Sequence, residues 1–174
     1  MTLGVDSDCE YLDIDLTEPI EAEDLAGRLN QQLPDGLVIL AAQEVPPRSP
    51  SIEASILAFR YHIDLDPQLD SADVDERLRA FLAATEFRIH KHARGGDRSV
   101  DARSYVSALA RRDVHQLEAE ILFGPRGTIK PGDLMTAILG LERSDASRLR
   151  VHKVDTVFRR PAMERPGQTS AAAI

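Results

Sequence analysis

The 174-residue sequence contains one cysteine and no tryptophan, and it has no long apolar run. The single thiol of Cys9 excludes an intramolecular disulfide, a cysteine-rich zinc site and a protein-ligated iron–sulfur cluster. No apolar run approaches the roughly 20 residues that cross a bilayer, and the first residues lack a basic and apolar leader. We therefore expect a cytoplasmic protein without a membrane segment.

Recognisable catalytic motifs are missing as well. There is no Gly-x-Ser-x-Gly elbow and no Walker A loop, and the acidic run over 6–15 lacks the turn glycine of an EF-hand. Aromatic residues make up only 5% of the chain, which limits base stacking. From the sequence we assign no catalytic residue, no metal ligand and no cofactor.

Charge is unevenly distributed along the chain, whose formal net charge is −8. Residues 1–60 carry 12 acidic and 3 basic side chains, whereas residues 61–174 carry 17 and 18. A basic stretch from Arg88 to Arg112 holds seven bases against Asp97 and Asp101. This pattern predicts two surfaces with different partners, or alternatively a solvated loop in an acidic protein.

Residues 1–46 follow a β-α-β pattern. Alternating apolar residues predict a strand over 10–16, helical spacing predicts a helix over about 21–33, and an apolar run predicts a buried strand over 37–45. A lone β-α-β unit leaves a sheet edge and an apolar face uncovered. We therefore interpret this unit as the C-terminal half of a ferredoxin-like domain.

Three prolines mark a linker over 47–51, and residues 52–160 predict a complete ferredoxin-like domain. The expected elements are a strand over 52–65 with a bulge near Leu57, a helix over 72–84, strands over 87–92 and 117–123, a helix from Pro131, and a strand over 149–158. A glycine turn predicts a hairpin arm over about 93–112, in which 100–106 pairs with 87–92. Residues 161–174 are expected to be disordered. The predicted class is α+β, a β-α-β-β-α-β domain preceded by a half-domain of the same type.

Five short stretches carry a family resemblance: LGVDSDCEYLDI (3–14), LTEP (16–19), QEVP (43–46), VDAR (100–103) and GTIKP (127–131). Over residues 3–157 the chain resembles the radical-SAM-linked proteins, a bacterial family of unknown function. The resemblance implies a radical SAM partner, encoded beside or fused to the family member, and an RNA- or ribosome-related neighbourhood. It also implies a preceding segment with Ser-His-Leu-Asp and Gly-Phe-Asn-Pro motifs, which would complete the first domain. By this comparison, either the start of the present sequence is placed too late, or the chain is a shortened relative of the family members.

The candidate binding surface lies in the basic stretch. Alternate residues of a strand share one face, which would group Arg88, His90 and His92. Arginine forks match phosphate geometry, so these side chains and their neighbours form a candidate anion or RNA surface. Its members are Arg88, His90, Lys91, His92, Arg94, Arg98, Asp101 and Arg103, with the more distant His115 as an addition.

Several alternatives remain open for these residues. The surface is a solvated sheet face, a phosphate or RNA contact, or a metal pair at His90 and His92, and we do not assign the metal. Asp101 and Arg103 form either a surface ion pair or a pair that orients a ligand.

These patterns favour a non-catalytic accessory module that docks on a radical SAM partner and presents RNA or a phosphorylated substrate. Radical SAM chemistry requires three cysteine thiolates, so this chain does not perform it alone. One rival is an RNA-directed acid–base enzyme that uses Asp101 with His90 or His92. Another is a protein–protein adaptor, or a homodimer, that uses an exposed sheet edge.

Overall fold

The computed structural model describes residues 5–93, 96–125, 127–142 and 149–159, with side chains described in these ranges except over 91–98. The described residues form two compact units. Residues 5–11 and 56–159 make the first, which we call the sheet unit, and residues 12–55 make the second, which we call the acidic unit. The predicted tail over 161–174 lies outside the described residues.

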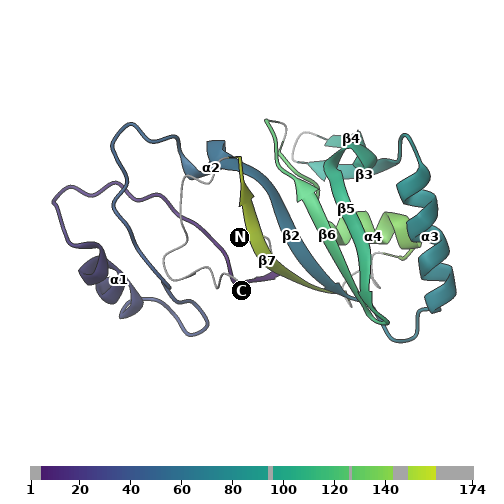
Figure 1. The fold of residues 1–174 in the computed structure, drawn as a ribbon, viewed down its shortest axis with the longest axis horizontal. Coiled ribbons are helices and arrows are strands. Elements are labelled where there is room, and N and C mark those ends of the chain that lie inside the picture. Colours follow the sequence, from purple (N-terminus) through teal and green to yellow (C-terminus); the bar gives the residue numbers. More distant parts are fainter. Residues whose placement is uncertain (1–4, 94–95, 126, 143–148, 160–174) are drawn as a thin grey trace, which may run out of the picture. The chain divides into compact units, whose positions relative to one another are not determined.

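The sheet unit is built on a five-stranded mixed sheet with the strand order β1-β7-β2-β6-β5 (Figure 1). β1 is parallel to β7, and all other neighbouring strands are antiparallel. The strands are β1 (Val5–Ser7), β2 (Ile56–Asp64), β5 (Val106–Asp113), β6 (Gln116–Leu122) and β7 (Arg150–Phe158). The predicted α+β class is therefore confirmed.

The two long helices of the sheet unit begin at residues that suit a helix N-terminus. α3 (Ser71–Ala83) starts after Asp70, whose carboxylate accepts hydrogen bonds from the backbone N–H groups of Ala72 at 2.7 Å and Asp73 at 3.3 Å. α4 (Pro131–Leu139) has its proline in the first turn, where no amide hydrogen is needed. It ends at Gly140, which has a left-handed φ of 61°.

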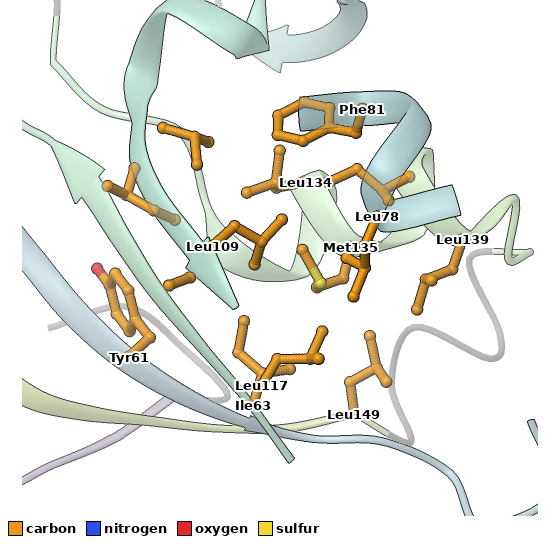
Figure 2. Packing of buried hydrophobic residues seen from close by; sticks show 14 of the residues in the cluster. Tyr61, Ile63, Leu78, Phe81, Leu109, Leu117, Leu134, Met135, Leu139 and Leu149 are labelled. Carbon is orange, nitrogen blue, oxygen red and sulfur yellow. The ribbon is translucent and has the colours of Figure 1, made fainter. Parts of the chain in front are cut away.

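The hydrophobic core lies between one face of the sheet and these helices (Figure 2). α3 contributes Leu78 and Phe81, and α4 contributes Leu134 and Met135. The sheet contributes Ile63, Leu109, Leu117 and Val151, among others. Period-2 alternation places the polar residues of β2 on the opposite face, which no helix of the core covers.

Most predicted elements of the sheet unit agree with the structure within a few residues. The main difference is at the start of β2, where residues 52–55 form the helical turn α2 (Ile52–Ser55). The pairing of β2 with β7 shifts between Ile56 and Ala58, so the predicted bulge near Leu57 is confirmed.

A hairpin at the glycine turn is confirmed, but the arm predicted over 93–112 is wrong in its extent and position. β3 (Arg88–Ala93) pairs with β4 (Gly96–Asp101), and a 3-10 turn, η1 (Ala102–Tyr105), then leads into β5 of the main sheet. The hairpin thus lies between α3 and β5 in the chain, before the second long strand of the main sheet and not after it. Sequence periodicity missed β5 because shifts of pairing register interrupt its alternation, leaving the buried Val106 and Leu109 three residues apart.

The two strands predicted over 10–16 and 37–45 are also wrong, since neither range contains a strand. The helix between them is confirmed as α1 (Ala22–Asn30). Alternation of apolar and polar residues indicates which face of a strand would be buried, but a strand also needs a neighbouring strand for its backbone hydrogen bonds. In the described part of the chain these two segments have no such neighbour, whereas Val5–Ser7 pair with β7.

Candidate functional site

The β3–β4 hairpin carries most of the predicted binding surface (Figure 1). Ile89 is buried and Val100, its partner in the ladder, packs against the core, so one face of the hairpin is anchored. Arg88 and His90 occupy alternate positions from Ile89, and both are exposed. The hairpin therefore presents basic residues on a fixed base.

The register of the hairpin places one pair of like charges opposite each other. Lys91 is the ladder partner of Arg98, and His92 is the partner of Asp97. The side chains of these four residues lie outside the described part of the structure, as does the whole of Arg94. What the backbone establishes is that the two cationic residues occupy directly opposed positions.

Arg88 has a nearby acidic partner. Its guanidinium lies 2.6 Å from a carboxylate oxygen of Glu86, and both side chains are more than half exposed. An ion pair in that setting contributes little to stability, because water and salt screen it. The Arg88 side chain can therefore exchange Glu86 for another anion at small cost.

Asp101 and Arg103 hold the turn that follows the hairpin. One carboxylate oxygen of Asp101 accepts hydrogen bonds from the backbone N–H groups of Phe87 at 2.9 Å and Arg103 at 3.1 Å. The Arg103 guanidinium donates to the Val106 carbonyl at 2.9 Å and lies 5.9 Å from the ring centre of Phe81. These contacts give both residues a positioning role between the hairpin and β5.

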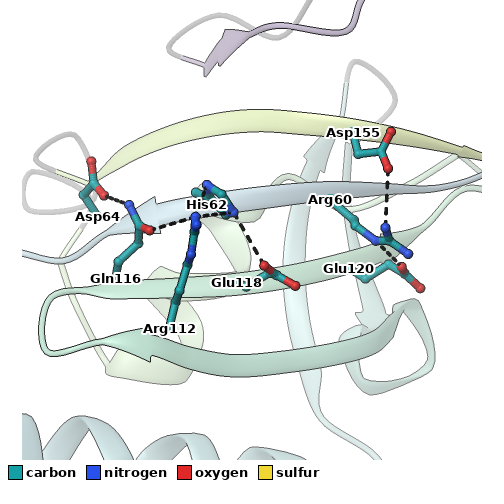
Figure 3. A network of polar contacts seen from close by, with 8 residues as sticks. All are labelled: Arg60, His62, Asp64, Arg112, Gln116, Glu118, Glu120 and Asp155. Atoms are coloured by element: carbon teal, nitrogen blue, oxygen red, sulfur yellow. Dashed lines mark hydrogen bonds and ion pairs between the residues drawn. The ribbon is translucent and has the colours of Figure 1, made fainter. Parts of the chain in front are cut away.

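The polar face of the sheet carries a network of hydrogen bonds and ion pairs between side chains of β2, β5, β6 and β7 (Figure 3). Arg60 on β2 lies 2.8 Å from Glu120 and 3.4 Å from Asp155. A second chain of contacts joins His62 to Arg112 and Glu118, Arg112 to Gln116, and Gln116 to Asp64. Four carboxylates face two arginines and one histidine here, so this face is not a favourable one for a polyanion.

An ion pair with a buried lysine lies where the chain leaves β1. The ammonium of Lys153, whose side chain is 8% exposed, lies 2.6 Å from a carboxylate oxygen of Glu10. It also lies 4.9 Å from the ring centre of Phe59. Beside it, the Thr156 hydroxyl donates to the backbone carbonyl of Cys9 at 3.1 Å. We did not predict this cluster, although alternation along β7 places Lys153 on the inward side with Val151.

The ionisable groups around this pair are not activated as nucleophiles. Burial raises the pKa of the Cys9 thiol, and burial together with the nearby Glu10 and Cys9 raises the pKa of the Tyr61 phenol. Burial also opposes ionisation of Glu10, but hydrogen bonds from Lys153 and Ser7 outweigh it and lower the pKa of this carboxyl. At neutral pH the thiol and the phenol are protonated and the carboxylate is charged.

A family model described as "Uncharacterized protein conserved in bacteria (DUF2344)" matches residues 1–131. The chain belongs to this bacterial family. The DUF2344 match runs from before β1 to the first residue of α4, so it includes the hairpin, whereas β7 with Lys153 lies beyond it. No curated protein and no solved structure matches the chain.

Two kinds of feature are absent from the described part of this DUF2344 chain. Among the described residues, no three histidine, cysteine, aspartate or glutamate side chains are grouped so that they would hold a metal ion. The helices in the described ranges are all too short or too polar to cross a bilayer.

Proposed function

We propose that this chain is a non-catalytic accessory module that binds RNA or a phosphorylated substrate on the β3–β4 hairpin and acts beside a radical SAM partner. The observation that carries the binding function is the cross-strand pairing of Lys91 with Arg98. Like charges that face each other directly in an antiparallel ladder destabilise it. A phosphate group between them removes that repulsion, so the hairpin gains stability when an anion is bound.

The surroundings of the hairpin agree with this assignment. Arg88 and His90 add exposed donors at positions that alternate with Lys91, so they serve an anion on the other face of the same short strand, where Glu86 is a partner that an anion readily replaces. The polar face of the sheet has an excess of carboxylates, which directs an anionic ligand away from it and toward the hairpin.

Two arguments favour an accessory role over catalysis. One carboxylate oxygen of Asp101 accepts hydrogen bonds from two backbone N–H groups, and its ladder partner is Arg88 rather than His90, which argues against an Asp101–His90 pair for acid–base chemistry. The thiol of Cys9 and the phenol of Tyr61 are protonated at neutral pH, which makes both weak nucleophiles. The radical SAM partner follows from the family resemblance, and the single cysteine requires that any such cluster belong to that partner.

The proposed architecture of the sheet unit is ferredoxin-like. Without β1 and the hairpin, its elements follow the order β-α-β-β-α-β, and its strands lie in the order β7-β2-β6-β5 with antiparallel neighbours. In this scheme the hairpin is an insertion between α3 and the second strand, where it leaves the sheet intact and adds a separate binding element.

The binding function is tested by fluorescence anisotropy with a labelled single-stranded RNA and with heparin as competitor. The test variant is Lys91→Ala/Arg98→Ala, and the matched control is Arg77→Ala/Arg79→Ala, which removes two exposed charges from α3. We expect the dissociation constant for RNA to rise at least tenfold in the test variant only. The slope of log K against log salt should fall by about 1.4, since each contact to single-stranded phosphate contributes about 0.7.

Equal losses in the two double variants would show that net charge alone drives binding and would contradict the hairpin as the site. RNA turnover by the purified protein, abolished in His90→Ala, would favour the enzyme. For the partner, the tagged protein is purified gently from its host, and a radical SAM protein should be present in the eluate. Its absence would contradict the accessory role.

A further inference from the structure

The acidic unit (residues 12–55) has no core of its own. Not one of its 44 residues is buried, and Leu12 and Leu40 are 75% and 79% exposed. A segment that buries so little apolar surface does not offset the conformational entropy lost on ordering. Its exposed large apolar side chains are Leu12, Ile14, Leu16, Leu37, Val38, Leu40 and Val45.

The side chain of Asn30 holds one apolar segment of this unit through the backbone of Ile39. The side-chain amide of Asn30 donates to the backbone carbonyl of Ile39 at 3.0 Å and accepts from its N–H at 2.7 Å. Ile39 is half-buried, while Val38 and Leu40 on either side of it are exposed. The run LVILAA over 37–42 is apolar at successive positions, which is typical of a strand covered on both faces. In the described residues this run has no covering layer.

The charge around these apolar residues is strongly of one sign. Residues 12–55 contain nine acidic side chains and two basic ones, Arg28 and Arg48. A partner that covers the apolar residues must therefore bring basic side chains to the rim, because close approach of further acidic groups is repulsive. A second copy of the same surface carries the same negative charge and is disfavoured for that reason.

We propose that residues 12–45 are the docking surface for a partner protein that presents an apolar sheet edge flanked by Lys and Arg. The partner adds a strand beside residues 37–42 and covers Val38 and Leu40, which completes the missing core. This surface shares no residue with the β3–β4 hairpin, and the proposal does not rest on the anion that the hairpin binds.

The test places a photo-activated cross-linking residue at position 38 or 40 of the full chain, in the host bacterium. The matched control is position 114, where Val114 is 62% exposed in the sheet unit, close to the 64% of Val38. We expect one partner protein to be captured from positions 38 and 40 and not from 114. Its cross-linked peptide should be apolar with Lys or Arg at its flanks.

Two variants make the result decisive. Asp35→Lys/Glu44→Lys reverses charge beside the apolar run and should abolish capture from position 40. Val38→Asp/Leu40→Asp, made without a cross-linker, should leave the melting temperature of the purified chain unchanged, because these side chains are uncovered in it. A lowered melting temperature would mean that they pack within the chain, which overturns the proposal. Cross-links to residues 56–159, to a second copy or to no protein would overturn it as well.

Discussion

The ammonium of Lys153 and the carboxylate of Glu10 lie 2.6 Å apart, although the lysine side chain is almost fully buried and the glutamate is 41% exposed. This asymmetry has a consequence for each partner. Without Glu10, the buried lysine charge keeps its contact with the face of Phe59 but loses its carboxylate partner. Without Lys153, the glutamate still has access to water.

We predict that Glu10→Gln lowers the free energy of unfolding more than Lys153→Met does. The first change leaves a buried charge uncompensated and should cost about 2 kcal/mol, below the range of a fully buried pair. The second places an apolar side chain of similar length over the Phe59 ring and should cost less than about 1 kcal/mol. Urea unfolding of the two variants at pH 7 measures both values. The reverse order would mean that the ion pair itself stabilises the fold.

Stability should fall as the pH is lowered below about 5. The pKa of Glu120 is lowered by hydrogen bonds from Ser107 and Arg60, and the pKa of Glu10 is also lowered. Each carboxylate therefore stabilises the native state above its usual pKa of 4.5, and this contribution is lost as the pH drops through the lower native value. Urea unfolding at pH 7, 5, 4 and 3 measures the change. Glu120→Gln should reduce the slope, and an unchanged slope would contradict this account.

Asp101 should prove structural. We predict that Asp101→Ala lowers the free energy of unfolding by about 1–2 kcal/mol, because two backbone N–H groups lose their acceptor. Asp101→Asn keeps an acceptor oxygen and should lose less than half as much. Thermal unfolding of the two variants checks this order. If the alanine variant were as stable as the native protein, the structural role would be contradicted and the ligand-orienting role would be favoured.

The Cys9 thiol should react slowly. Burial raises its pKa, so little thiolate is present at pH 8. We predict that iodoacetamide alkylates Cys9 at least tenfold more slowly in the native chain than in urea. The control is Cys9→Ser/Val114→Cys, which moves the thiol to an exposed turn and should react at nearly the same rate in both conditions. Rapid alkylation of native Cys9 would contradict its protected state.

The sequence predicts well those elements whose signal is local. Asp70 and Pro131 mark the starts of α3 and α4 through the chemistry of the helix N-terminus. The bulge near Leu57 was visible as a change of phase in the apolar alternation. β5 was missed because its register shifts destroy the period of two on which strand prediction depends.

The candidate site was predictable only in part. The basic residues of the hairpin lie close together in the sequence, so their charge is apparent without a structure. The positioning roles of Asp101 and Arg103 depend on a turn whose direction no periodicity encodes. Glu10 and Lys153 are 143 positions apart, and nothing local indicates that a parallel pairing brings them together.

The parallel pairing of Val5–Ser7 with residues 151–153 has a consequence for biosynthesis. β2, at the centre of the sheet, bonds to β6 and β7, both of which leave the ribosome long after it. The nascent chain must therefore carry its N-terminal residues and an unpaired central strand until almost the whole sheet unit has been translated. Contacts of such high sequence separation slow folding and prolong exposure of strand edges. We expect this protein to depend on chaperones that shield nascent chains more than a helical protein of equal length.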